Sequence, residues 1–290
     1  MAVVSSSSPL TARRKLGAEL RLLRDGTGLT AEEVGGHLGC HGSKVSRVEL
    51  GKRTCTRKDF DALMELYEVD DTKREVLAEL FKRGRQRVPP WWHIYNDVIS
   101  ANYSEFLSYE AEAAEGREYQ PLLIPGLLQS ADYARAVTGS SYVALGPDQV
   151  DSLVEVRLRR QERLREKDPL VFDGIVTEAA LRIEVGGAAV MRAQLRKLVE
   201  VMSLPNVNLR VIPFKAGEKG ASTGAFILFS SATDAAPDVA FTESAENTTS
   251  LRDEPIALRR LNRMFNNLSA AALSTEDSVE LLRRIEKELV

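Results

Sequence analysis

Apolar residues recur at helical spacing in five short stretches near the start of the chain. In the first stretch, Leu16, Leu20 and Leu23 lie three or four positions apart, the spacing of one face of a helix. Thr30 followed by Glu33 is typical of a capping box at a helix start, and Gly51 suits the position just after a helix end. The pattern predicts five helices, at Ala12–Arg24, at Ala31–Leu38, at Gly42–Leu50, around Phe60, Leu63, Met64 and Tyr67, and around Val76, Leu77, Leu80 and Phe81.

The second and third of these helices have the spacing of a helix-turn-helix motif. Gly35 allows two helix backbones to approach each other, and Gly39 suits a turn with positive φ. Such a motif places its second helix in the major groove of DNA, so the sequence predicts double-stranded DNA as a partner. The apolar positions expected to hold the two helices together are Val34, Leu38, Val45 and Val48.

The rest of the chain alternates between helical and strand-like patterns. Apolar residues three or four positions apart predict helices at Asp97–Gly116, through Tyr133 and Val137, and at Pro147–Glu166, Ala188–Ser203, Pro255–Leu268 and Thr275–Leu289. Runs rich in β-branched and aromatic residues predict strands at Val171–Thr177, Asn208–Phe214, Phe226–Phe229 and Asp238–Phe241, and Tyr119–Gln129 is expected to be extended. The predicted fold class is an all-α five-helix head followed by a mixed α/β domain with C-terminal helices.

The boundary between two domains is expected in a basic segment that ends in Pro89 and Pro90, because proline removes backbone donors and disfavours helix in the residue before it. Residues 1–11 are predicted to be a flexible tail, residues 12–84 a helix-turn-helix head and residues 85–90 a linker. Residues 91–290, called the body below, form the second domain. Its first residues, Trp91 to Tyr95, are expected to pack against the rest of the body.

Charge is divided between head and body. Residues 1–90 hold 17 Lys and Arg against 13 Asp and Glu, and the remaining residues hold 22 against 29, which together give the net charge of -3. Binding to DNA depends on local charge, because salt screens electrostatic fields within about 10 Å.

No apolar run reaches the roughly 20 residues of a membrane helix, and the first residues lack the pattern of a signal peptide. The sequence predicts a cytoplasmic protein without a membrane partner, in which Cys40 and Cys55 stay reduced.

The predicted recognition helix carries candidates for both base and phosphate contacts. Its N-terminal turn should face base edges, and Arg47 is the strongest specificity candidate because its planar fork matches guanine O6 and N7. The alternative for Arg47 is an ion pair with Glu49 or Glu33. The predicted base contacts are His41, Gly42, Ser43, Ser46 and Arg47, and the predicted phosphate contacts are Thr30, Ala31, Lys44, Lys52, Arg53, Arg57 and Lys58.

The head, with its runs Leu29–Gly39 and Lys44–Arg53, resembles the Xre or phage-repressor type of helix-turn-helix domain. The body resembles the C-terminal domain of unknown function that follows such heads in actinobacterial regulators. The resemblance covers nearly all of the chain, and its matching pieces are Pro125–Ser130, Asp132–Ala136, Arg157–Gln161, Thr177–Arg182, Gln194–Leu195, Pro205–Val207 and Ala272–Ser274.

The resemblance implies a transcription factor that binds a palindromic site as a homodimer and works with a small acidic companion protein. His41-Gly42 is an unusual opening for a recognition helix, so no operator sequence is carried over from relatives.

An enzymatic function is not expected. The chain has no His-Glu-x-x-His run of a metalloprotease. A self-cleaving repressor needs a Ser and Lys pair and a scissile bond such as Ala-Gly. The chain has these residue types near one another, at Ala216-Gly217, Lys219 and Ser222, but only their composition suggests this activity. A zinc cluster of His37, Cys40, His41 and Cys55 is disfavoured because the two histidines flank a turn that must face DNA or pack on the recognition helix. No metal or cofactor is predicted.

Three hypotheses remain for the body. It dimerises and receives a signal for a DNA-binding head, it is a protein-interaction module controlled by a small acidic companion, or it is a ligand-gated sensor with a pocket in the α/β domain. For the last two, the candidate ligand or partner residues are Glu110, Tyr119, Arg157, Gln161 and Glu178. Ion pairs that tie the long helix to the sheet explain the same residues without a ligand.

Overall fold

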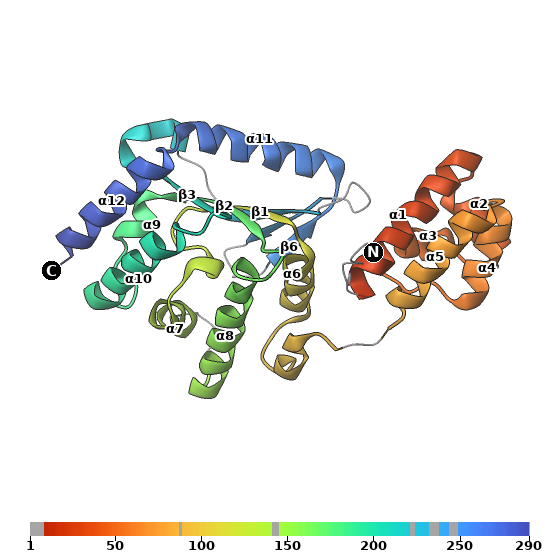
Figure 1. The fold of residues 1–290 in the computed structure, drawn as a ribbon, viewed down its shortest axis with the longest axis horizontal. Coiled ribbons are helices and arrows are strands. Elements are labelled where there is room, and N and C mark those ends of the chain that lie inside the picture. The colour runs from red at the N-terminus through yellow and green to blue at the C-terminus, as the bar shows by residue number, and fades with distance from the viewer. Residues whose placement is uncertain are drawn as a thin grey trace. The chain divides into compact units, whose positions relative to one another are not determined.

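A computed structural model describes residues 9–86, 89–140, 145–220, 224–231, 238–243 and 249–289. The chain forms two compact units, the first ending at Pro90 and the second beginning at Trp91. The first is all-helical and the second is mixed α/β with helices at its end, so the predicted fold class is confirmed (Figure 1). Most of the predicted tail and two residues of the predicted linker, 87 and 88, lie outside the described residues.

The five helices of the first unit begin where side chains cap their first turns. Thr30 and Glu33 form the predicted capping box, and Thr56 and Asp70 cap later helices in a similar way. The first helix begins at Pro9, so three residues assigned to the tail are helical. The helices are α1 (Pro9–Thr27), α2 (Ala31–His37), α3 (Gly42–Glu49), α4 (Arg57–Leu66) and α5 (Asp71–Gly84).

Glycines allow the close packing of α3 against its neighbours. A Cβ atom on Gly35 would lie 2.7 Å from the Cys40 carbonyl oxygen and 2.8 Å from the Gly42 nitrogen. Gly39 has φ of 66°, a conformation that glycine adopts without strain. Gly17 of α1 faces the carbonyl oxygens at the end of α3 so closely that a side chain would clash. The helix-turn-helix geometry predicted from Gly35 and Gly39 is confirmed.

The second unit surrounds one six-stranded sheet. Its strands are β1 (Glu115–Gln120), β2 (Val171–Thr177), β3 (Val207–Ile212), β4 (Phe226–Ser230), β5 (Val239–Glu243) and β6 (Thr249–Arg252). Its α-helices are α6 (Ala101–Glu112), α7 (Ala131–Gly139), α8 (Pro147–Arg160), α9 (Glu178–Arg182), α10 (Ala188–Val201), α11 (Pro255–Ala271) and α12 (Thr275–Glu288). Short 3₁₀ helices are η1 (Trp91–Tyr95), η2 (Gly126–Leu128), η3 (Gln161–Leu164) and η4 (Phe214–Gly220).

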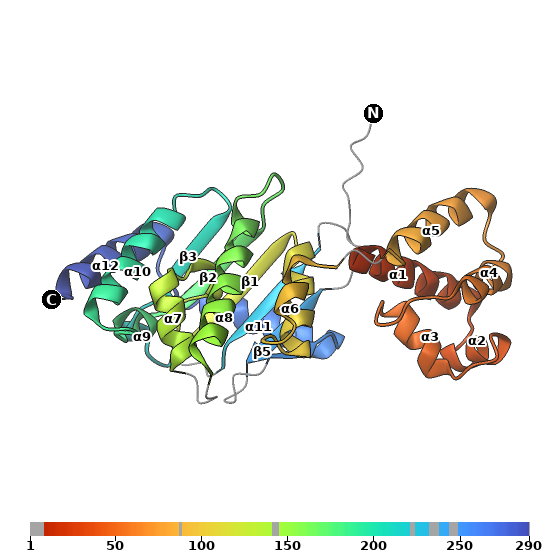
Figure 2. The same ribbon diagram turned by 90° about the horizontal axis from the view of Figure 1, so that it is seen from below.

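The strands are ordered β3-β2-β1-β4-β5-β6, with β1, β2 and β3 parallel and the remaining pairs antiparallel. Helix α11 lies along one face of the sheet, while α6, α7, α8 and α10 lie along the other (Figures 1 and 2). Alternate residues of each strand therefore enter two cores. Tyr119 and Phe226 pack towards Phe265 of α11, whereas Phe229 and Phe241 pack in the larger core, which also holds Trp92 and Tyr95.

The central strand β1 is the main correction to the sequence prediction. The predicted helix Asp97–Gly116 and the extended segment Tyr119–Gln129 each overlapped this strand. Its sequence, Glu-Gly-Arg-Glu-Tyr-Gln, lacks the apolar alternation of a half-buried strand because Glu118 and Gln120 point into the body. Strand β6 and helix α9 were also missed, and α8 ends at Arg160 instead of Glu166. No described helix is long and apolar enough to cross a membrane.

Candidate nucleic-acid interface

Helix α3 has one buried face and one exposed face. Val45 and Val48 are buried in the head core, whereas Ser43 and Arg47 are exposed one turn apart. His41 is the N-cap of the helix, and its Nδ1 accepts a hydrogen bond from the Ser43 N–H at 3.3 Å. The exposed face therefore presents polar side chains from the N-terminal turn onward, as a recognition helix requires.

Arg47 does not pair with either of the carboxylates considered for it. Its Nε donates to the Ser43 carbonyl oxygen at 3.1 Å, which holds the guanidinium stem along α3. Glu49 accepts from Arg24 Nε at 2.7 Å, and Glu33 accepts from the Thr30 N–H at 2.8 Å within the capping box. The Arg47 side chain is exposed on α3.

Basic side chains follow the recognition helix. The Arg53 N–H donates to the Arg47 carbonyl oxygen at 3.0 Å, which folds the next segment back on the end of α3. Arg57 is 70% exposed at its side chain and donates to Asp61 at 2.7 Å, a bond that a phosphate can replace at little cost because surface ion pairs are weak. The exposed predicted phosphate contacts in this region are Lys52, Arg53, Arg57 and Lys58, and Thr30 and Ala31 lie at the start of α2.

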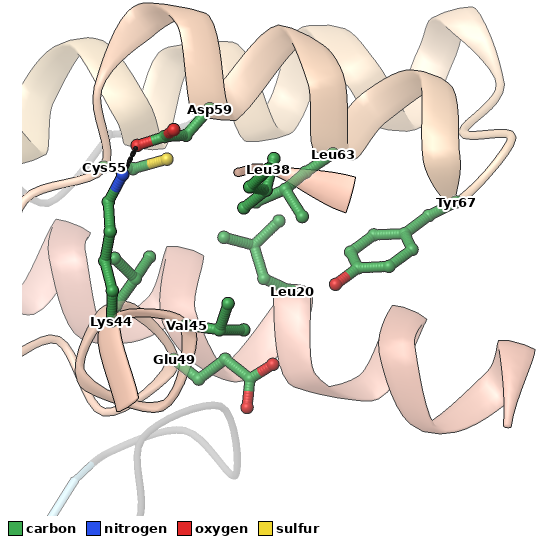
Figure 3. A pocket seen from close by; sticks show the side chains of 10 residues that line it. Leu20, Leu38, Lys44, Val45, Glu49, Cys55, Asp59, Leu63 and Tyr67 are labelled. Atoms are coloured by element: carbon green, nitrogen blue, oxygen red, sulfur yellow. Dashed lines mark ion pairs between the residues drawn. The ribbon is translucent and has the colours of Figure 1, made fainter. Parts of the chain in front are cut away.

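Two of the predicted DNA contacts have structural roles in the head. Lys44 Nζ lies 2.8 Å from the buried Asp59, so its charge ties α3 to α4 (Figure 3). Gly42 is buried, and a Cβ atom there would lie 2.9 Å from the Cα of Glu32 and overlap its carboxylate. Sequence reasoning assigned both to DNA because it could not show what lies beneath the first turn of α3.

Buried ion pairs anchor the inner side of α3. Glu49 is bound by Arg24 of α1, and Asp59 is bound by Lys44, around a cavity of about 10 Å³ that Tyr67 and Cys55 also line. Burial raises the pKa of Asp59, but the hydrogen bonds from Lys44 and Thr56 outweigh this effect and lower it. Burial raises the pKa of the Cys55 thiol to about 12, so this cysteine is protonated and unreactive near neutral pH. These contacts fix the orientation of α3.

The structure does not bring the five candidate ligand residues of the body together. Tyr119 is fully buried on the α11 side of the sheet, whereas Glu110 lies on the opposite side, bound by Arg160 through two bonds of 2.6 Å. Glu178 accepts from the Phe214 N–H at 2.9 Å, at the start of α9. Arg157 and Gln161 both bind Gln129, Arg157 at the side-chain oxygen and Gln161 at the backbone oxygen. The set is not one pocket.

Two of the matching pieces of the body, through Gln161 and Gln194, bind the loop Pro125–Ser130. Gln161 donates to the carbonyl oxygens of Gly126 and Gln129, and Gln194 donates to that of Leu128 and accepts from the Ser130 N–H. Lys197 Nζ donates to the Gln129 carbonyl oxygen at 2.7 Å. A loop buried among apolar side chains needs such partners for its backbone groups. Gln161 and Gln194 therefore have a structural role, since they satisfy the backbone groups of this loop.

Sequence reasoning missed a buried polar group at the end of β1. Gln120 Nε2 donates to Glu118 at 3.0 Å and to Glu243 of β5 at 3.2 Å. Burial raises the pKa of Glu118 to about 8 and also raises the pKa of Glu243, although Gln120 acts in the opposite direction on both. Polar residues at alternate positions, Glu118 and Gln120, at the junction of the predicted helix and the predicted extended segment are the signal that could have indicated a strand here.

We expect Glu118 to make the stability of the body depend on pH. Between its usual pKa near 4.5 and the raised value near 8, the folded state holds a proton that the unfolded state has lost, so stability falls as pH rises through this range. Glu118→Gln removes this dependence. Relative to the natural chain, the variant should gain about 2 kcal/mol between pH 6 and pH 8. Urea unfolding of both proteins at the two pH values measures the difference.

The other charged groups around Glu118 are Glu243, Glu110 and Arg160, and they are the same in both proteins. The matched control is Glu115→Gln at the start of the same strand, where the side chain is 45% exposed. A pH dependence equal in the natural chain and in Glu118→Gln would contradict the prediction.

Ser222, considered above for self-cleavage, lies outside the described residues. Within the described ranges, no group of three or more His, Cys, Asp or Glu residues is placed to hold a metal ion.

Comparison with protein families gives two matches. The model described as a domain of unknown function (DUF5753) matches residues 103–284, which is more than half of the chain. The model described as a helix-turn-helix domain matches residues 15–77, which include α2 and α3. No significant match was found among curated proteins or among solved structures.

Proposed function

Because the chain belongs to the family of proteins that contain the domain of unknown function DUF5753 and also has a helix-turn-helix domain, we propose that it is a sequence-specific DNA-binding transcriptional regulator. The observation that carries the proposal is the exposed polar face of α3. Ion pairs of Glu49 with Arg24 and of Lys44 with Asp59 fix the orientation of this helix, and basic residues follow its end. A rigid helix that presents polar side chains to the major groove is what base recognition needs.

In this proposal, base and phosphate contacts come from different residues. The side chains of the exposed face read bases, with Arg47 binding a guanine through its guanidinium. The basic residues after α3 neutralise phosphates and set affinity and register. The proposed base contacts are His41, Ser43, Ser46 and Arg47, and the proposed phosphate contacts are Thr30, Ala31, Lys52, Arg53, Arg57 and Lys58.

Selection of bound sequences from random DNA with the full-length chain tests this function. A regulator of this kind should enrich one short sequence, and its affinity for that sequence should fall steeply with salt, because each neutralised phosphate releases counterions. Enrichment of no sequence would contradict the proposal. A binding constant that does not change between 50 mM and 200 mM salt would exclude the phosphate contacts.

We further propose that the body forms a homodimer and receives the signal that controls DNA binding. The resemblance to Xre-type actinobacterial regulators supports this role and adds a palindromic site and a small acidic companion protein. The residues after Pro90 hold more Asp and Glu than Lys and Arg, a balance that favours a role other than phosphate binding. The alternative is that the body is mainly an interaction module for the companion, or a ligand-gated sensor. As a DNA-binding protein it would act in the cytoplasm.

Removal of the body should weaken DNA binding if the body dimerises. A chain of residues 1–90 should bind a palindromic site at least tenfold more weakly than the full-length chain, because the second half-site contact loses its high effective concentration. Titration of a labelled duplex measures both affinities. Fusion of residues 1–90 to an unrelated dimerisation domain is the control and should restore binding. Equal affinity of residues 1–90 and the full-length chain would contradict dimerisation through the body.

A further inference from the structure

The carboxylate of Glu32 lies across the first turn of the recognition helix. Glu32 belongs to α2, but it reaches over Gly42, the first residue of α3, and a side chain on Gly42 would collide with it. The Glu32 side chain is 68% exposed, so its contact with His41 lies at the surface and is not a buried structural ion pair. Because Gly42 has no Cβ atom, the Glu32 carboxylate of the preceding helix can lie over the N-terminal turn of α3 as a hydrogen-bond acceptor.

His41 places a donor beside this acceptor. Its Nδ1 accepts from the Ser43 N–H at 3.3 Å, so the neutral ring carries its proton on Nε2. Nε2 lies 3.5 Å from Glu32 Oε1, and the His41 side chain is 78% exposed. An acceptor and a donor from two helices therefore stand side by side at the surface, at the end of α3 that approaches base edges.

A carboxylate is an unusual group to place against DNA, because phosphates repel it. It is stabilised only where a base offers a donor. In the major groove cytosine N4 and adenine N6 are donors, and cytosine N4 is the usual partner of a Glu or Asp carboxylate. The partner guanine of the same base pair offers an acceptor, O6, beside that donor. One acceptor and one donor on the protein match this pair of groups. Adenine N6 and thymine O4 offer a similar pair, and the C·G pair is favoured because carboxylates typically accept from cytosine N4.

We propose that Glu32 and His41 together read one C·G base pair, with Glu32 accepting from cytosine N4 and His41 Nε2 donating to guanine O6. This inference rests on the proposed DNA-binding function and adds Glu32, a residue outside the recognition helix, as a determinant of specificity. Glu32 discriminates by repulsion as well as by attraction, since thymine O4 and guanine O6 are acceptors that a carboxylate rejects.

The test selects sequences from random DNA with the full-length chain and with two variants, Glu32→Ala and Glu32→Gln. The natural chain should enrich cytosine at one position of each half-site. In Glu32→Ala, the preference for cytosine at that position should fall about tenfold while other positions are unchanged. In Glu32→Gln, the preference should move towards adenine, because an amide pairs with adenine N6 and N7.

The matched control is Glu65→Ala, which removes an exposed carboxylate of α4 and should change no base preference. Thermal unfolding shows whether each variant is folded, and Glu32→Gln keeps the size of the side chain if Glu32→Ala does not fold. If Glu32→Ala binds all sequences more tightly by the same factor, the carboxylate only repels phosphates and the inference is wrong. If the natural chain enriches no sequence, the proposed DNA-binding function fails as well.

Discussion

Replacement of Glu110 by alanine is expected to lower the free energy of unfolding of the body by about 3–5 kcal/mol. The carboxylate of Glu110 accepts two bonds of 2.6 Å from Arg160, and both side chains are almost fully buried. The variant leaves the Arg160 guanidinium in the interior without its counter-charge, next to the rings of Phe106 and Tyr103. Chemical unfolding followed by tryptophan fluorescence measures the loss, because Trp91 and Trp92 both lie in the body.

A control on the same helix separates this effect from a general loss of helix stability. Glu105 is exposed on α6, and Glu105→Ala should change stability by no more than about 0.5 kcal/mol. The double variant Glu110→Leu with Arg160→Met replaces the ion pair by apolar side chains. It should recover most of the lost stability, because no unpaired charge is left in the interior. A loss in Glu110→Ala no larger than that in Glu105→Ala would show that the pair is not buried in solution.

Replacement of Arg47 by alanine should abolish most of the preference for the selected DNA sequence over random DNA. The arginine lies on the exposed face of α3, with its Nε held by the Ser43 carbonyl oxygen. A bidentate bond to guanine discriminates by about 1–3 kcal/mol, so the ratio of specific to random affinity should fall roughly 5-fold to 150-fold. Competition titrations with the selected duplex and a scrambled duplex measure this ratio.

Lys52→Ala is the comparison for Arg47→Ala. Lys52 is an exposed cation beyond the recognition helix, and its loss should weaken binding to both duplexes by a similar factor. It should also reduce the slope of log affinity against log salt by about 1, the value expected for one phosphate contact. If both variants lose affinity equally for both duplexes, the division into base-reading and phosphate-binding residues is incorrect.

Much of the head could be predicted from local signals. The capping box at Thr30 and Glu33 and the glycines at 35 and 39 act within a few residues of one another, so the helices and the turn that they predict are confirmed. The extra turn at the start of α1 was missed, because Pro9 begins it inside a stretch that reads as a tail. Arg47 was selected from residue type and helix position alone.

The roles of Lys44 and Gly42 could not be predicted in the same way. In the sequence, Lys44 is a basic residue in a basic segment, and only the packing of α4 shows that Asp59 binds it. In the sequence, Gly42 suggests close approach to DNA, and only the fold shows that it makes room for Glu32. Neighbours distant in the sequence decide both cases.

In the body, the apolar strands and the amphipathic helices could be predicted from the pattern along the chain, because burial on one face imposes a period that can be counted. The packing of the fold was needed to show that the polar segment Glu115–Gln120 is the central strand and that Glu110 and Arg160 are partners. A buried polar residue is stable only with a hydrogen-bonding or charged partner, and here that partner comes from another element. Periodicity records which side chains are buried, whereas the pairing of polar groups depends on the fold.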